Sequence, residues 1–184
     1  MKILKIKKSL NEAIISIKNG QVLICPTDTV YGLICDAGNK KAVEKIYQIK
    51  QRPKNKLMPI FVSDIKMAKK LAEINKKQEG FLKKVWPGTV TAILKSKNVK
   101  GTIGVRIPNY KWLLGLAEQL NQPLAETSAN ISGEPATTKI KEVLKYFKGR
   151  EYHPDLAIDA GNLKKSRPSK VIDLTVWPPK ILRE

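Results

Sequence analysis

The stretch that decides the fold runs from Ile24 to Val62 and reads ICPTDTVYGLICDAGNKKAVEKIYQIKQRPKNKLMPIFV. An apolar run is stopped by Pro26, the polar turn Thr27-Asp28-Thr29 follows, and residues 30–34 are apolar again. A short amphipathic helix then leads to a proline-broken loop rich in Lys and Arg. This order is typical of a ligand site in which hydroxyl groups orient a polar substrate and cations hold phosphates. A buried hairpin beside a solvated cationic loop would explain the stretch equally well, so the rest of the chain must decide.

Length and hydropathy indicate one domain, residues 1–184. The chain has 184 residues, of which 42% are hydrophobic and 28% charged, and this is the composition of an ordinary globular protein with a sizeable core. It contains no linker, no internal repeat, no 18-residue apolar span and no signal-peptide pattern. We therefore expect a soluble, cytoplasmic protein without a membrane segment.

The net charge and the few reactive side chains limit which functions the chain can have. The formal net charge of +19 favours a polyanionic partner, with tRNA or double-stranded RNA as candidates, although lysines scattered over all faces would explain it too. We expect Cys25 and Cys35 to be free thiols in the core. Two separated cysteines and one histidine do not match zinc spacing. His153 is expected in a loop, and no Ser-His-Asp or Cys-His mechanism is assigned to it.

Hydrophobic periodicity predicts an α/β order with several hairpin-like strand pairs, and hence a mixed sheet. Ser9 and Glu12 match a capping box, Ser63-Asp64 can cap a later helix, and Thr137 or Thr138 can cap the last one. Neither a Walker loop nor a strand-linked GxGxxG occurs, so any ATP site is built without them. The strands are expected at residues 3–6, 22–25, 30–34, 57–62, 89–94, 102–107, 123–126, 156–158, 171–174 and 180–182.

Two short constellations are candidates for chemistry: Lys50-x-Arg52 and Ser128-x-Asn130, the second directly after an expected strand. Arg106 ends another strand before Pro108, and Ser169 stands at the entry to a late one. Each also has a plain structural explanation. Cations are favoured at a helix C-terminus, Ser and Asn are common turn formers, and Arg106 could be a surface residue at a strand end.

Taken together, the motifs form an ordered series: PTDTVYGL, the KxRP loop, WPG-T-T, VRIP, TSANxSGxP and a closing VIDLT…PPxILR. The series closely resembles the YrdC-type threonylcarbamoyl-AMP synthases and covers nearly the whole chain. The resemblance implies a YrdC-like α/β fold, with a strongly twisted mixed sheet flanked by helices around an open concave cavity. It implies that L-threonine, bicarbonate and ATP, with Mg²⁺, give threonylcarbamoyl-AMP and pyrophosphate. That product serves threonylcarbamoylation of the tRNA adenosine next to the anticodon.

The resemblance also implies roles for individual residues. Lys50 and Arg52 would be the catalytic pair facing the phosphates, and Arg106 would clamp the carboxylate of threonine. Such chemistry needs positioning and charge neutralisation more than a strong base. The implied threonine contacts are Thr29, Arg106, Ser128 and Ser169. The implied ATP contacts are Arg52, Lys56, Thr102, Asn130, Thr138 and Arg183.

The sequence departs from the family pattern at two positions. Phe61 stands where many relatives have histidine, which leaves only a backbone contact there, and Lys170 replaces a threonine after Ser169. The chain resembles the short, single-domain type, which implies separate threonylcarbamoyl-transfer proteins as partners. Two other functions stay open: an RNA-binding module, and a paralogue of the same fold acting on another carbamoyl or acyl substrate.

Overall fold

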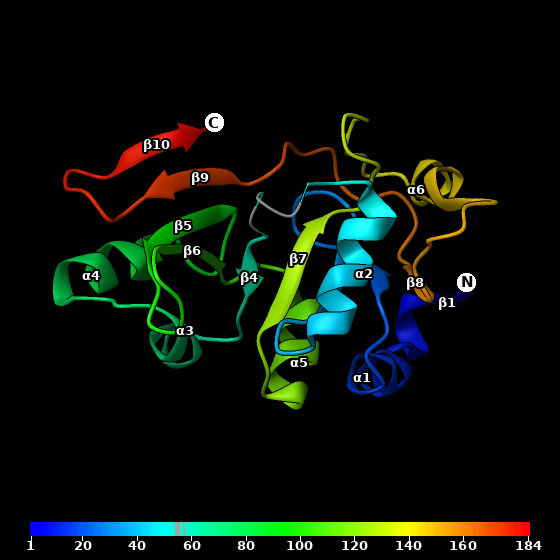
Figure 1. Ribbon diagram of the computed structural model, residues 1–184, viewed down its shortest axis with the longest axis horizontal. Coiled ribbons are helices and arrows are strands. Elements are labelled where there is room, and N and C mark those ends of the chain that lie inside the picture. The colour runs from blue at the N-terminus through cyan, green and yellow to red at the C-terminus, as the bar shows by residue number, and fades with distance from the viewer. Residues whose placement is uncertain (54–55, 57) are drawn as a thin grey trace.

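The computed structural model describes residues 1–53, 56 and 58–184, and this part of the chain forms one ten-stranded sheet (Figure 1). Its strand order is β1-β8-β2-β3-β7-β4-β6-β5-β9-β10. The strands are β1 (Lys2–Lys5), β2 (Leu23–Cys25), β3 (Gly32–Asp36), β4 (Ile60–Phe61), β5 (Val90–Lys95), β6 (Thr102–Arg106), β7 (Leu124–Ser128), β8 (Leu156–Asp159), β9 (Lys170–Asp173) and β10 (Lys180–Arg183).

The pairing confirms the predicted mixed sheet. β8 runs parallel to both β1 and β2, and the pairs β4–β6 and β5–β9 are also parallel. The remaining neighbours in the order, such as β3 and β7, are antiparallel.

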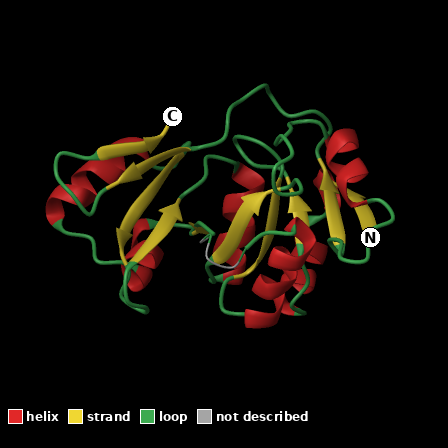
Figure 2. Ribbon diagram, turned by 45° about the horizontal axis from the view of Figure 1, so that its top comes forward, coloured by secondary structure: helices red, strands yellow, loops and turns green. Residues whose placement is uncertain are grey.

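Helices cover both faces of the sheet (Figure 2). They are α1 (Leu10–Lys18), α2 (Lys40–Lys50), α3 (Ile65–Leu71), α4 (Lys76–Val85), α5 (Lys111–Leu120) and α6 (Ile140–Phe147), with a 3-10 turn η1 at Ile6–Lys8. The alternation of side chains along β2 shows how the two faces are filled. Ile24 packs in a cluster with residues of α2 and α6, whereas Leu23 and Cys25 pack with residues of α1 and α5. A third cluster joins α3 and α4 to β5, β6 and β9.

One connection crosses the molecule. β8 is the second strand in the sheet order and β9 the ninth, so residues 160–169 must pass the strands between them. Figures 1 and 2 show this segment arching over the ends of the central strands. Ser169 is thereby carried from one end of the sheet to the other, and arrives next to β5.

Most expected elements are present, with three local corrections. The capping box at Ser9 does not form: its Oγ donates to the carbonyl of Ile6 at 2.9 Å, because the preceding 3-10 turn offers a closer acceptor. Neither Thr137 nor Thr138 is the N-cap of α6, which is Lys139 without a side-chain bond. The strand expected at 57–62 is reduced to β4, and its first residue, Leu57, lies outside the described residues.

Other expectations are confirmed. Asp64 caps α3 by accepting a hydrogen bond from the backbone N–H of Met67 at 2.6 Å. Cys25 and Cys35 are free and buried, and burial raises the pKa of the Cys35 thiol to about 12. His153 lies in the loop before β8. Within the described residues, no helix has the length and apolar character required to cross a bilayer.

Candidate active site

A cavity of about 310 Å³ opens where the central strands meet the entry to β9. Six of the residues predicted from the sequence line it, although they come from distant parts of the chain. They are Thr29, Arg52, Arg106, Ser128, Ser169 and Arg183. A second hollow of about 330 Å³, which includes Asp28 and Tyr110, adjoins the cavity through Thr29.

The turn between β2 and β3 is fixed by the hydroxyl of Thr27. Its Oγ1 accepts the backbone N–H of Thr29 at 3.0 Å and donates to the carbonyl of Val30 at 2.7 Å. The hydroxyls of Thr27 and Thr29 lie 3.0 Å apart, and both residues are buried. Because Pro26 ends β2 and Thr27 closes the turn on itself, Thr29 is presented at the cavity wall in a fixed orientation.

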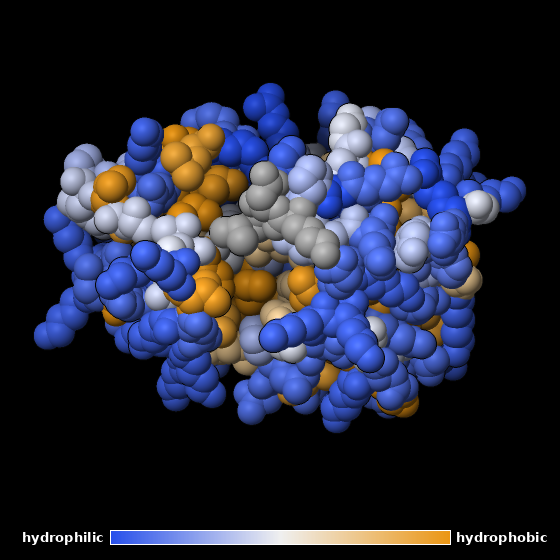
Figure 3. Space-filling view, viewed as in Figure 1, coloured by the Kyte–Doolittle hydropathy of each residue, from blue (hydrophilic) through white to orange (hydrophobic). Residues whose placement is uncertain are grey.

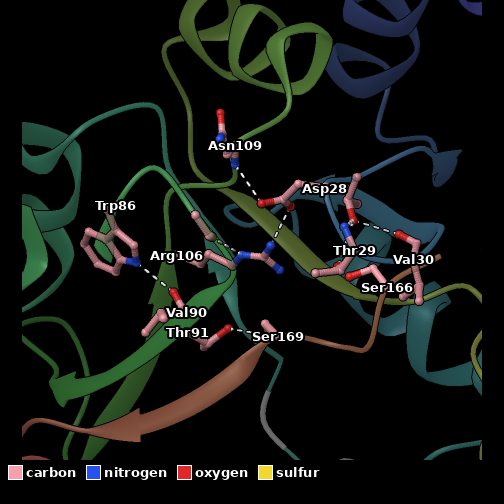
Figure 4. Close-up of polar contacts among 12 residues, drawn as sticks. Asp28, Thr29, Val30, Trp86, Val90, Thr91, Arg106, Asn109, Ser166 and Ser169 are labelled. Carbon is pink, nitrogen blue, oxygen red and sulfur yellow. Dashed lines mark hydrogen bonds and ion pairs between the residues drawn. The ribbon is translucent and has the colours of Figure 1, made fainter. Parts of the chain in front are cut away.

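Arg106 forms the most buried charged group of the site, since only 2% of its side chain is exposed. Its Nε donates to the carbonyl of Gly88 at 2.8 Å, and its Nη2 forms an ion pair with Asp28 (Figure 4). Asp28 also accepts the backbone N–H of Asn109 at 2.9 Å. The guanidinium carbon lies 5.5 Å from the ring centre of Phe61. Phe61, which stands where many relatives have histidine, therefore makes a cation–π contact with Arg106.

Lys50 holds the loop after β7. Its Nζ donates to the carbonyls of Ser128 and Asn130 at 2.6 and 2.9 Å, and to Asn130 Oδ1 at 3.0 Å. Ser128 Oγ donates to the same Oδ1 at 2.6 Å. Burial, followed by the charge of Arg52, lowers the pKa of Lys50 to about 8, whereas Glu126 opposes this shift. All three N–H groups of the ammonium thus have acceptors on the loop, and a contact between Lys50 and phosphates stays a prediction.

Ser169 is held at the opposite side of the cavity. Its hydroxyl lies 2.9 Å from that of Thr91 on β5. Arg183 on β10 donates to the carbonyl of Ser169 from Nε at 3.1 Å and from Nη2 at 2.7 Å. The replacement at Lys170 leaves these contacts intact, because the side chain of Lys170 pairs with Glu184 at 3.3 Å on the surface.

Five predicted residues do not line the cavity, and Lys50, which holds the loop after β7, is one of them. Asn130 contacts the cavity residue Ser128 instead, because its Oδ1 accepts hydrogen bonds from Ser128 Oγ and Lys50 Nζ. Lys56 and Thr102 are exposed, and Thr138 is half-buried on the segment before α6. Arg52 does line the cavity, and its Nη1 donates to Thr127 Oγ1 at 3.2 Å. The structure thus groups the threonine set and part of the ATP set.

The sequence did not point to four polar residues of the site: Asp28, Thr91, Glu126 and Thr127. Asp28 was visible within the polar turn, but its partner Arg106 is 78 positions away. Thr91 reads as an ordinary strand residue. Glu126 carried one usable signal, a carboxylate in a strand whose neighbours are apolar or small. Burial raises its pKa to about 7, although Arg106, Lys50 and Arg183 act to lower that pKa.

Solved structures of other proteins share this fold. A solved structure of Pyrococcus abyssi Sua5 complexed with L-threonine superposes with a TM-score of 0.88 and 34% identity, covering 99% of this chain and 56% of that one. The structure of E. coli YciO gives a TM-score of 0.84 and 28% identity, covering 95% of this chain and 88% of that chain. The chain thus spans about half the length of the Pyrococcus abyssi proteins that it matches.

Sequence comparison points in the same direction. A putative threonylcarbamoyl-AMP synthase of Methanocaldococcus jannaschii is 40% identical over 168 residues, which are 86% of this chain and 76% of the relative. A family profile described as telomere recombination and named for Sua5, YciO and YrdC matches residues 16–184. With that match covering nearly all of the fold and every residue of the cavity, the chain belongs to the Sua5/YciO/YrdC family.

Proposed function

We propose that this chain forms threonylcarbamoyl-AMP from L-threonine, bicarbonate and ATP, with release of pyrophosphate. One observation carries the proposal. A single cavity combines a buried arginine, oriented by Asp28 and Gly88, with five short hydroxyl side chains and with the cations Arg52 and Arg183. An amino acid and a phosphate chain can therefore bind next to each other in this cavity.

In this proposal, Arg106 binds the amino-acid substrate. A guanidinium has five N–H donors, and the bonds to Gly88 and Asp28 take two of them. The remaining donors can hold a carboxylate in a planar arrangement. The hydroxyls of Thr29, Ser128 and Ser169 surround that position and can bond the side-chain hydroxyl of threonine. Fixing both ends of the substrate places its amino group for attack on bicarbonate.

In the same proposal, the nucleotide is bound by Arg52, Asn130 and Arg183. The carbamate oxygen attacks the α-phosphorus of ATP, a bond to phosphorus forms, and pyrophosphate leaves. Such a step depends on positioning and on neutralising charge at the phosphates, which two guanidinium groups can do. Lys50 takes part indirectly, because it fixes the loop that carries Ser128 and Asn130.

Magnesium enters with the nucleotide as part of the substrate. The described residues contain no group of three or more His, Cys, Asp or Glu side chains that could hold a metal ion. Of the two carboxylates near the cavity, Asp28 is already engaged by Arg106 and by the backbone of Asn109. The residues present do not fit a protein-built magnesium cage, so no step is assigned to one.

The deciding experiment measures pyrophosphate release from ATP and magnesium while L-threonine or bicarbonate is omitted in turn. We expect release that requires both, and serine in place of threonine then tests selectivity. Arg52→Ala and Asn130→Ala should each abolish release without loss of the fold, whereas Asn98→Ala on an exposed loop should leave it unchanged. Wild-type turnover in both site variants would contradict the residue assignment. Nucleotide binding without threonine-dependent release would instead favour a paralogue with another carbamoyl or acyl substrate.

RNA binding is a second candidate function, favoured by the net charge of +19. Four cations line one surface hollow of about 470 Å³ beside α6: Lys141, Lys145, Lys148 and Arg150. Specific binding of tRNA or double-stranded RNA should be submicromolar, with a log–log salt slope of several units. Weak binding that ignores RNA structure and is lost by about 0.2 M salt would contradict a specific role. In either case, separate threonylcarbamoyl-transfer proteins would pass the product to tRNA.

A further inference from the structure

Glu126 points into the cavity from the middle of β7, and the mechanism above does not use it. The neighbouring strand β3 makes room for its carboxylate with a glycine. A Cβ atom placed on Gly32 would lie 3.1 Å from Glu126 Oε1 and 3.4 Å from the methyl group of Thr27. The carboxylate therefore lies over the bare face of Gly32, beside the turn that carries Thr29.

The charges around Glu126 are engaged by other groups. Arg106 from β6 bonds Asp28 and Gly88, Lys50 from α2 bonds the loop after β7, and Arg183 from β10 bonds Ser169. These three cations favour the ionised form of Glu126, whereas Asp28 and burial oppose it. Among the residues that the structure describes, none donates a hydrogen bond to this carboxylate. It is an acceptor inside a binding cavity, available to a ligand that brings its own donors.

An amino acid brings such donors. Arg106 offers a site for its carboxylate, and the opposite charge of the ammonium group then requires an acceptor in the same cavity. Arg106 and Glu126 can supply this pair, because both line the cavity, as several hydroxyl side chains do. This step rests on the proposed function.

We propose that Glu126 binds the amino group of the amino-acid substrate and takes the proton that this group must lose before it attacks bicarbonate. The ammonium gives one proton to the carboxylate and becomes a neutral amine. Its lone pair forms the C–N bond with the carbon of bicarbonate. The hydroxyl group of bicarbonate leaves with a second proton from nitrogen as water, and the carbamate anion remains. Glu126 later returns its proton to solvent.

The acid–base properties of Glu126 suit this task. A general base is most effective when its pKa lies near the working pH, and burial raises that of Glu126 to about 7. An ordinary exposed glutamate would be a much weaker proton acceptor. Cys25 from β2 also packs near Glu126, and its raised pKa keeps that thiol neutral, so it does not compete for the proton.

The competing explanation is that Glu126 only offsets the charge of the surrounding cations. The two roles differ in their dependence on pH. Without a base, the reaction must wait for amine that is already deprotonated in solution, and that fraction rises tenfold per pH unit below the pKa of the ammonium group. If Glu126 only offset the charge of the cations, its loss would instead change the affinity for ATP and lower the rate by a factor that does not depend on pH.

The test compares wild type, Glu126→Gln and Glu126→Asp in pyrophosphate release from pH 6 to 9. Binding of a non-hydrolysable ATP analogue and thermal unfolding are measured in parallel. We expect Glu126→Gln to lose about 100-fold at pH 7 and to recover progressively toward pH 9, with ATP affinity within about threefold of wild type. Glu126→Asp keeps a carboxylate and should retain more activity than the glutamine variant at pH 7. Glu118→Gln, on the exposed side of α5, is the matched control and should behave as wild type.

Three results would overturn the inference: full activity of Glu126→Gln at every pH, a deficit independent of pH together with weaker ATP binding, or equal loss in the Gln and Asp variants. Failure of the proposed function is distinguishable from these results. In that case the wild-type protein itself would show no release that depends on threonine and bicarbonate.

Discussion

The two walls of the cavity are built differently. The inner wall consists of β7 and β6, which lie in the middle of the sheet, and of the turn before β3. There, Arg106 and Thr29 are nearly inaccessible to solvent. The outer wall is the hairpin of β9 and β10 at the sheet's end, where all four residues of β10 are exposed. Figure 3 shows hydrophobic side chains gathered on the surface over that end, among the hydrophilic residues that cover most of this face.

The difference separates two kinds of contribution to binding. Polar groups of the inner wall are held by the core, so they are oriented before any substrate arrives. Those of the outer wall are held by the pairing of β9 with β5 and by the bonds between Arg183 and Ser169. Because every residue of β10 is exposed, we expect the local stability of this strand to be lower than that of the inner wall. A substitution in the inner wall should therefore affect stability and activity together, whereas one in the outer wall should affect mainly activity.

The largest effect is expected for Arg106→Met. Removal of the guanidinium leaves Asp28 nearly buried without its ion-pair partner, which costs about 3–5 kcal/mol of the free energy of unfolding. The same change removes the proposed carboxylate clamp, and threonine-dependent pyrophosphate release should fall at least about 100-fold. Urea unfolding and the release assay measure the two effects.

The double variant Asp28→Asn/Arg106→Met separates these effects. Since the unpaired charge is then absent, at least half of the lost stability should return, while activity should stay low. Recovery of activity in the double variant would mean that Arg106 acts only through the fold. An unchanged unfolding free energy in Arg106→Met would show that the inner wall is no more rigid than the outer wall.

A smaller effect is expected for Arg183→Ala on the outer wall. The substitution removes the bonds from Arg183 to Ser169 and a cation that lines the cavity. We expect the KM for ATP to rise about tenfold, which corresponds to about 1.4 kcal/mol, with the unfolding free energy changed by less than about 0.5 kcal/mol. Lys180→Ala is a matched control on the same exposed strand. A loss of stability comparable to that of Arg106→Met would contradict the distinction between the walls.

How far the sequence could predict these walls depends on how local the signals are. The α/β order, the mixed sheet and a strand that leads to Ser128 follow from periodicity and motifs that span a few residues, although the structure extends β7 to include Ser128, which was expected on the loop. Arg106 and Ser128 were found in the same way, and the fold brings them to one cavity. The resemblance to a family supplied the grouping of these residues, which no single motif contained.

Long-range arrangement accounts for what the sequence did not show. No residue near Asp28 in the sequence indicates that it pairs with Arg106, because this contact depends on the pairing of β4 with both β6 and β7. The hydroxyl of Ser9 would cap α1 in an isolated helix, but a 3-10 turn before it provides another acceptor. Glu126 was overlooked because its environment is created by Gly32 on a neighbouring strand and by cations from three other elements.

The smallest predicted effect is the pH dependence that Glu126 gives to stability. Its pKa in the folded state, about 7, lies above the ordinary value of 4.5, so the folded protein binds a proton that the unfolded chain has released in this range. Stability must therefore decrease as pH rises from about 4.5 to 7. Because the carboxylate is partly accessible through the cavity, we expect this contribution to be about 1 kcal/mol.

The measurement compares the free energy of unfolding of wild type and Glu126→Gln between pH 5 and 7.5, with Glu118→Gln as control. The range ends below pH 8, because the lowered pKa of Lys50 gives the opposite slope above that value, where the unfolded chain retains a proton that the folded protein has lost. The difference between variant and wild type should grow in favour of Glu126→Gln as pH rises. A constant difference would mean that the inner wall solvates Glu126 as water does. In that case burial could not make this carboxylate a base at neutral pH.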